Sequence, residues 1–227
     1  MIHILDRPVW NAFTGRQAGM ATRRGAALRV DPEIAPFAAT VDLSAASLAD
    51  LVPLAAVGGL ALVEPEGSVL PIPPQLTIVK SATLVQMVAE QLTAPPADFA
   101  YRVLGAEDAP AMLALATLTE PGPFRLRTRE FGGYIGVERD GALVAMAGER
   151  MRPDGFAEVS GVCTHPDHRG QGLAAGLMQA VAAAIRARGE IPFLHTYATN
   201  HGAIALYERL GYRFRRGISL TLLAPAG

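Results

Sequence analysis

A glycine-containing turn between a predicted strand and a predicted helix constrains the fold more than any other feature of this chain. The turn follows an apolar segment at 156–164 and precedes a helical pattern at about 171–188. In such a turn the first backbone N–H groups of the helix stay unpaired and meet at the positive end of the helix dipole. Glycines let a phosphate approach the backbone, and an arginine adds positive charge, so the turn predicts a pyrophosphate site. Its residues are Arg169, Gly170, Gln171, Gly172, Leu173 and Ala174.

The segments that follow residue 98 alternate between strand and helix patterns. The Asp140-Gly141 pair is a strong hairpin signal, and it joins two apolar strands in a predicted antiparallel meander. Leucine, valine and isoleucine recur every fourth residue from Leu173 to Ile185, which predicts one buried helix face. The chain is therefore predicted to be an α+β protein. The predicted strands are 101–104, 133–138, 142–150, 156–164 and 193–198, the helices are 107–118, 171–188 and 200–210, and a closing strand pair lies at 212–214 and 218–223.

The first part of the chain has shorter and more interrupted patterns. We expect helices at 47–56 and 82–92 and a strand at 60–63. Pro95 and Pro96 then stop both helix and sheet, so residues 93–98 are predicted to form a linker. This places an N-terminal region of unassigned role at 1–97, packing on or extending a second domain at 98–227.

The glycine turn has two other interpretations. In the first, it only packs the helix on the sheet. Alternatively, Gly170, Gly172 and Ala175 match the spacing of a dinucleotide-binding fold. In that fold, however, the first glycine follows the strand almost directly and an acidic residue ends the next strand. Here five residues intervene, and the next strand ends at Ala198 without a carboxylate.

Two segments together resemble the GNAT superfamily of N-acetyltransferases. Residues 162–174 resemble its acetyl-CoA motif, Q/R-x-x-G-x-G/A, with Arg169, Gly172 and Ala174 at the defined places. Residues 200–212 resemble its second signature, N-x-x-A-x-x-L-Y-x-x-x-G-F/Y. The resemblance covers about 101–223. It implies a central, mostly antiparallel, splayed mixed sheet flanked by helices, to which this chain adds an N-terminal α/β region.

The resemblance also implies a site and a co-substrate, acetyl-CoA, with no metal. In such proteins the strand that ends at Thr164 binds the pantetheine arm through its backbone, Asn200 contacts the same arm, and Tyr207 protonates the departing thiolate. The implied cofactor-binding residues are Val162, Cys163, Thr164, His168, Arg169, Gly170, Gln171, Gly172, Leu173, Ala174, Asn200, Ala203 and Tyr207.

Transfer to an amine requires groups beyond the cofactor site. An ammonium ion is not a nucleophile, so a base must first deprotonate the acceptor, which we expect to be a primary amine on a small molecule or a peptide. Glu158 and Glu149 are the candidate bases, although each is equally well interpreted as a solvated strand carboxylate. Negative charge on the carbonyl oxygen needs backbone donors, for which the N–H near Cys163 is a candidate.

Composition limits the partners and the compartment. The 20 basic and 21 acidic residues leave no positive excess for nucleic acid. The apolar run at 51–63 is broken by Pro53 and is too short to span a membrane, and the amino terminus lacks a secretory signal. Cys163 is the only cysteine, which excludes an intrachain disulfide. We therefore expect a cytoplasmic monomer or homodimer.

Three alternative functions remain beside the transferase. Cys163, His165 and His168 suggest a zinc site, but ligands usually come in separated pairs. Cys163 and His165 also suggest a thiol hydrolase, although alternate residues on a strand point outward in parallel. The third is a non-catalytic acyl-CoA-binding sensor or regulatory module of the same fold.

Overall fold

The computed structural model describes residues 3–89 and 91–227. In these ranges an eight-stranded mixed sheet is flanked by five α-helices, and a smaller antiparallel sheet of three strands lies in the N-terminal region. The predicted α+β class is confirmed. The helices are α1 (Pro8–Thr14), α2 (Ala45–Ala49), α3 (Ala109–Thr119), α4 (Leu173–Ala187) and α5 (His201–Arg209).

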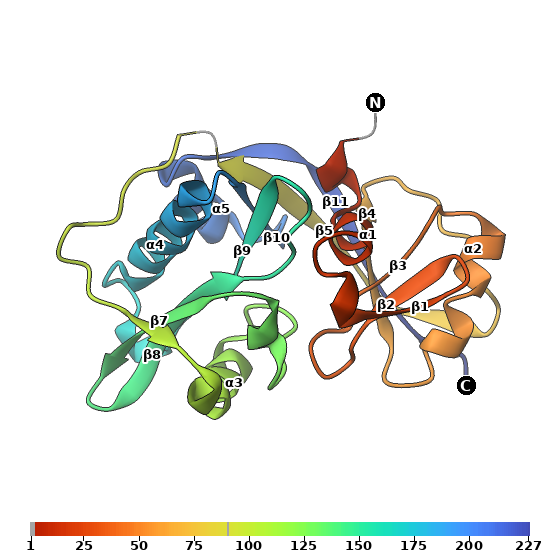
Figure 1. Cartoon of the computed structure of the whole chain (residues 1–227), viewed down its shortest axis with the longest axis horizontal. Helices are drawn as coiled ribbons and strands as arrows, with labels where there is room; N and C mark the ends of the chain where they lie inside the picture. Colours follow the sequence, from red (N-terminus) through yellow and green to blue (C-terminus); the bar gives the residue numbers. More distant parts are fainter. Residues whose placement is uncertain (1–2, 90) are drawn as a thin grey trace.

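The large sheet combines strands from both ends of the sequence. Its order is β4 (Leu60–Pro65), β11 (Tyr212–Pro225), β5 (Leu76–Ala89), β10 (Ile191–Tyr197), β9 (Phe156–Thr164), β8 (Ala142–Glu149), β7 (Tyr134–Arg139) and β6 (Arg102–Leu104). The small sheet consists of β1 (Ala21–Arg24), β2 (Ala27–Val30) and β3 (Ala38–Thr40). In Figure 1 the small sheet lies at one end of the molecule and α4 and α5 at the other, with β5 and β11 running between them.

Strands β9 and β10 are the parallel pair among the described strands, and they separate soon after they meet. Their pairing covers Ile191–Phe193 on β10 and Phe156–Glu158 on β9. Both strands then continue for several residues without pairing to each other. The backbone groups of β9 and β10 beyond Glu158 and Phe193 therefore face a gap between two diverging strands.

The meander and the long helix form as the sequence predicts. Asp140 and Gly141 have φ of 52° and 78°, the left-handed conformations that a two-residue hairpin turn needs, and they join β7 to β8. Helix α4 buries its predicted stripe, which includes Leu177 and Ile185, against β8 and β9. Gly189, with φ of 79°, ends this helix.

Part of the predicted secondary structure is wrong. The helix expected at 82–92 is strand β5 as far as Ala89, and Glu90 lies outside the described residues, as do Met1 and Ile2 of the amino terminus. The second half of this strand packs against a different apolar cluster on each face, one containing Leu84 and the other Met87, so the alternation typical of a strand is lost.

Two further segments differ from the expectation. The helix predicted at 47–56 ends early: α2 stops at Ala49, and a separate 3₁₀ turn spans Val52–Leu54 around Pro53. The closing strand pair is one long strand, β11, with an irregularity in its pairing between Phe214 and Arg216. A short irregularity of this kind bends a strand without ending it.

The N-terminal region shares its core with the rest of the chain. One apolar cluster contains Leu5 and Phe13 from the first helices together with Phe131, Met151 and Phe193 from beyond the predicted linker. All five are at most 3% exposed. The division at residue 97 stays a prediction, but these contacts and the central position of β5 tie both parts to one sheet. Among the described helices, none has the length and apolar character required to cross a bilayer.

Candidate functional site

Two cavities meet beside the gap between β9 and β10, and three residues line both of them: Val162, Asn200 and Tyr207. The loop cavity, of about 540 Å³, lies at the N-terminus of α4. The strand cavity, of about 160 Å³, is lined by residues of β9, β10 and neighbouring segments, and its wall includes Phe37 and His195. A ligand in one cavity can therefore contact a ligand in the other at the three shared residues.

The loop cavity gathers twelve of the thirteen residues that the sequence suggests for cofactor binding. Gln171 is the one that does not line it. Gly170 and Gly172 have φ of 79° and 77°, and a Cβ at either position would meet no atom within 4 Å. The residues in the wall are Val162, Cys163, Thr164, His168, Arg169, Gly170, Gly172, Leu173, Ala174, Asn200, Ala203 and Tyr207.

The N-terminus of α4 has the properties of an anion site. Gly172 is its N-cap and offers no side chain to pair the first N–H groups of the helix, while its open surroundings leave them accessible. Arg169 lies at the same cavity wall and is exposed. The hydroxyl oxygen of Thr164, also in this wall, is buried and has no hydrogen-bond partner within the described part of the chain. Polar groups in this arrangement fit a phosphorylated ligand with a polar arm.

A bulge in β9 brings Val162 to the point where the cavities meet. Ser160 pairs with Gly148 and Cys163 with Met146, so two residues of β9 lie opposite one residue of β8. Gly161 takes φ of 64°, and a Cβ there would approach the Tyr134 ring to 2.9 Å. A bulge leaves a backbone group unpaired and redirects the strand. Only glycine meets both requirements at 161.

Helix α5 positions the two other shared residues. The Asn200 side chain caps the helix by accepting a hydrogen bond from Ala203 N at 3.2 Å. Tyr207 lies two turns further along and packs against the Tyr212 ring. Burial raises the pKa of the Tyr207 hydroxyl to about 12. This hydroxyl therefore stays protonated near neutral pH and can donate a proton or a hydrogen bond.

The Glu158 carboxylate is fully buried beside the strand cavity, between two residues of its wall. It accepts hydrogen bonds from Arg150 Nε at 2.8 Å and Nη2 at 2.7 Å, and His195 Nδ1 lies 2.7 Å from its Oε1. Burial raises the pKa of Glu158, but the opposing effects of Arg150 and His195 are larger and lower it to about 2. Glu158 is therefore ionised and holds both partners in place.

The orientation of His195 follows from a second set of contacts. Arg215 Nη1 donates to Gln86 Oε1 at 2.7 Å, which directs the Gln86 amide nitrogen toward Leu5 O and toward His195 Nε2, each at 2.9 Å. His195 Nε2 therefore accepts a hydrogen bond, and its Nδ1–H donates to Glu158. The imidazole is fixed as one tautomer, and its single ring lone pair, on Nε2, points at the Gln86 amide.

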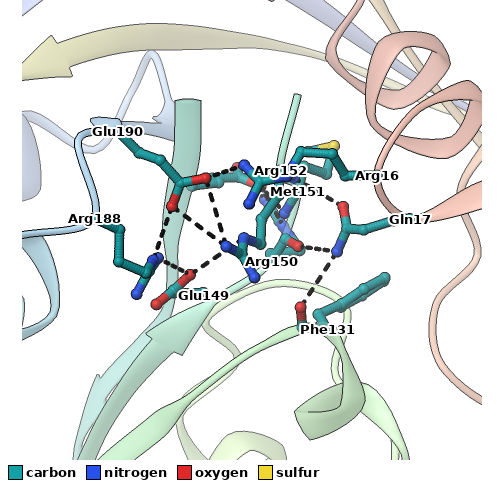
Figure 2. Close-up of polar contacts among 10 residues, drawn as sticks. Arg16, Gln17, Phe131, Glu149, Arg150, Met151, Arg152, Arg188 and Glu190 are labelled. Carbon is teal, nitrogen blue, oxygen red and sulfur yellow. Dashed lines mark hydrogen bonds and ion pairs between the residues drawn. The ribbon is translucent and has the colours of Figure 1, made fainter. Parts of the chain in front are cut away.

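Glu149, the other candidate base, lies in a different place. Its carboxylate accepts a hydrogen bond from Arg188 Nη2 at 2.7 Å and lies 3.7 Å from Arg152 Nε. Glu190 completes the cluster by pairing with Arg152, Arg188 and Arg16, as Figure 2 shows. Glu149 lines neither cavity.

Gln17, which the sequence does not single out, links this cluster to the wall of the strand cavity. Its Nε2 donates to the carbonyls of Arg150 and Phe131 at 2.8 and 3.3 Å, and its Oε1 accepts from Arg152 N at 2.8 Å (Figure 2). Arg150 and Met151 of this segment both line the cavity. A residue 133 positions earlier in the chain thus fixes the backbone that carries Arg150.

The cysteine is not placed for nucleophilic catalysis. Cys163 is buried on β9, and burial raises the pKa of its thiol to about 11. The thiol therefore stays protonated near neutral pH, whereas a nucleophile requires the thiolate. His165 Nδ1 instead accepts a hydrogen bond from the backbone N–H of Asp167 at 3.3 Å.

Comparison with known proteins identifies relatives of the whole chain. The family model described as FR47-like protein matches residues 134–218. A solved structure from Novosphingobium aromaticivorans, assigned to the GNAT acetyltransferase family, is 46% identical, covers 100% of both chains and superposes with a TM-score of 0.92. A GCN5-related N-acetyltransferase from Kribbella flavida, 23% identical over 100% of this chain and 98% of that one, shares the fold with a TM-score of 0.66.

A search of curated proteins finds no match. The full-length similarity to the Novosphingobium protein nevertheless includes the glycine turn, the bulged strand β9 and helix α5, which together form the loop cavity. By this similarity, the chain belongs to the GNAT family of acetyltransferases.

Proposed function

We propose that this protein transfers the acetyl group of acetyl-CoA to a primary amine, on a small molecule or a peptide, by direct attack of the amine on the thioester. The observation that carries the proposal is that the two cavities meet at Val162, Asn200 and Tyr207. Direct transfer needs the acyl donor and the acceptor held against each other at one point. The loop cavity suits the donor, and the strand cavity suits the acceptor.

The wall of the loop cavity fits a CoA-type ligand. Acetyl-CoA would place its pyrophosphate at the N–H groups that begin α4 and supply the activated acetyl thioester. Gly170 and Gly172 leave that approach open, and Arg169 contributes a positive charge beside it. The unpaired Thr164 hydroxyl and the Asn200 side chain are then available to the pantetheine arm.

Tyr207 and the bulge in β9 are assigned to the thioester. Tyr207 keeps its proton near neutral pH because burial raises its pKa to about 12, and it donates that proton to the departing thiolate. The backbone N–H freed by the bulge near Val162 and Cys163 donates to the carbonyl oxygen as negative charge develops.

Deprotonation of the acceptor is assigned to Glu158 and His195 acting as a pair. Both oxygens of Glu158 already accept hydrogen bonds, so this carboxylate orients His195 and stabilises the imidazolium that forms. His195 Nε2 carries the basic lone pair, which accepts a hydrogen bond from the Gln86 amide, so the acceptor amine displaces that donor before its proton passes to Nε2. Within the described residues, the Glu149 carboxylate pairs with Arg152 and Arg188, neither of which lines a cavity. We therefore assign Glu149 to the ion cluster.

Two measurements test the transferase against a non-catalytic acyl-CoA sensor. Isothermal titration with acetyl-CoA measures donor binding, and release of CoA thiol over a panel of primary amines measures transfer. We expect binding together with turnover on at least one amine. Tight binding of acetyl-CoA without turnover on any amine would favour the sensor, and transfer only to hydroxyl groups would contradict the choice of an amine acceptor.

A further inference from the structure

Arg150 lines the strand cavity and has hydrogen-bond donors that Glu158 does not engage. Its Nε and Nη2 are both engaged by Glu158, and within residues 3–89 and 91–227 no group accepts a hydrogen bond from its Nη1. The Phe37 ring lies 5.1 Å from the guanidinium carbon, and Gln17 holds the Arg150 carbonyl. The side chain is 13% exposed and lines the cavity. Its position is thus fixed before any ligand arrives.

The charges around the cavity favour an anionic group on the ligand. Arg150 is the arginine in the described wall, and Lys80 lies just outside it, with Nζ 5.2 Å from the centre of the Tyr197 ring. The carboxylate of the wall belongs to Glu120, which is exposed at the end of α3. Glu158 lies behind Arg150 with both oxygens engaged, so it is not available to hold an ammonium group.

The wall also has an apolar part, about as extensive as its polar part. This apolar surface includes side chains of β4, β5, β11 and the segments that flank β3 and β8. An acceptor that fills the cavity must therefore combine an apolar body with a group that accepts hydrogen bonds from Arg150. The apolar residues on these segments that line the cavity are Phe37, Val63, Leu84, Met151 and Leu220.

We propose that the acceptor is an apolar amino acid whose carboxylate binds Arg150 Nη1 while its side chain packs on this apolar wall. Guanidinium groups bind carboxylates with strong, directional hydrogen bonds. The proposal rests on the transferase function proposed above, since it names the acceptor of that reaction. Arg150 then acts as a specificity-determining residue and takes no part in moving the proton.

Matched amines separate the contribution of the carboxylate from that of the apolar body. Phenylalanine, phenylalaninamide and phenethylamine share one side chain and differ in the group beside the amine, as do leucine, leucinamide and isoamylamine. We expect kcat/KM for each amino acid to exceed that for its amide and its decarboxylated amine by about 10- to 100-fold, the ratio that a charge-assisted hydrogen bond provides.

Replacement of Arg150 identifies the donor. Arg150→Lys keeps the positive charge beside Glu158 but removes the guanidinium donors, so the preference for phenylalanine over phenylalaninamide should fall toward one. A merely structural loss would instead lower turnover of all three amines equally. Arg152→Lys, which changes an arginine that does not line the cavity, should keep the preference. If Arg150→Lys does not fold, the double variant Arg150→Met with Glu158→Gln removes both charges of the ion pair together. The same ratio of kcat/KM, phenylalanine over phenylalaninamide, is then measured for the double variant.

The outcomes distinguish this inference from the proposed function. Equal kcat/KM for the amino acids and their amides, or an unchanged preference in both Arg150 variants, would overturn the inference and leave the transferase in place. If acetyl-CoA binds and no amine of any kind is acetylated, the transferase fails and the inference fails with it.

Discussion

The hydroxyl of Tyr207 lies where the two cavities meet, and we predict that its loss affects the chemical step. Tyr207→Phe should lower kcat by about 10- to 100-fold, because the proton donor is lost, and should leave the KM for acetyl-CoA nearly unchanged. Tyr212→Phe is the matched control, because its hydroxyl is buried nearby without a partner among the described residues and lines neither cavity. Unchanged kcat with a raised KM in Tyr207→Phe would assign Tyr207 to binding alone.

A side chain at Gly172 would have two effects: it would strain the left-handed backbone, and it would occupy space in the loop cavity. A matched variant separates the two. Gly172→Leu should raise the Kd for acetyl-CoA by about 10- to 100-fold, as expected for lost hydrogen bonds to a charged group. Gly189→Leu carries the same backbone strain, because φ is 77° at 172 and 79° at 189 and both positions open to empty space, but Gly189 lies at the other end of α4. Isothermal titration that finds equal losses in both variants would attribute the effect to strain.

Glu158 should govern stability in acid. Its pKa falls from an ordinary 4.5 to about 2, so its ionised form stabilises the folded state fully above about pH 4.5. That contribution is lost as the pH falls from about 4.5 to about 2. At pH 7, Glu158→Gln should lower the free energy of unfolding by about 3–5 kcal/mol, because Arg150 is left buried without its counter-charge.

Urea unfolding of both proteins at pH 7, 4 and 3 measures this dependence. The difference between wild type and Glu158→Gln should shrink as the pH is lowered. A constant difference at all three pH values would mean that the charge of Glu158 does not stabilise the fold.

At the scale of elements, Gln17 joins the segment after α1 to the segment that follows β8. Gln17→Ala leaves the carbonyl of Arg150 and the N–H of Arg152 without partners, so unfolding should become easier by about 1–3 kcal/mol. The KM for the acceptor should rise more than the KM for acetyl-CoA, since the affected segment lines only the strand cavity.

Gln179 provides the control for this variant. Its amide also donates to two neighbours, Thr93 and Ala94, but these contacts are exposed. Gln179→Ala should change stability by no more than about 0.5 kcal/mol. Similar losses in both variants would show that Gln17 is an ordinary surface contact.

The elements also show what could be predicted from the sequence. Helix α4 and the turn before it were predictable, because a four-residue stripe and two glycines are local signals. Strand β5 was not, because burial on both faces removes the alternation that marks a strand. His195 and Gln17 were missed for a different reason: their partners lie 37 and 133 residues away, and spacing along the chain does not reveal such contacts. Arg150 pairs with Glu158 only 8 residues away, but that contact depends on how β9 folds back beside the end of β8.

For the whole molecule, we predict that residues 98–227 do not fold alone. Without residues 1–97, β10 and β11 would lose the strand that lies between them, and the apolar cluster around Phe131, Met151 and Phe193 would be exposed. Circular dichroism and thermal unfolding of this fragment should show no cooperative transition. A fragment that unfolds cooperatively and retains full activity would show that the N-terminal region does not shape the acceptor site.

The walls of the two cavities come from different parts of the chain. The wall of the loop cavity is confined to residues between Thr119 and Arg209, whereas the wall of the strand cavity extends from Phe37 to Leu220. Random variation limited to Phe37, Val63 and Leu84 should therefore yield enzymes with new acceptor ranges that still recognise the same acyl donor. Laboratory evolution of this protein can therefore reshape the acceptor cavity through these three residues while Arg150 and the wall of the loop cavity stay unchanged.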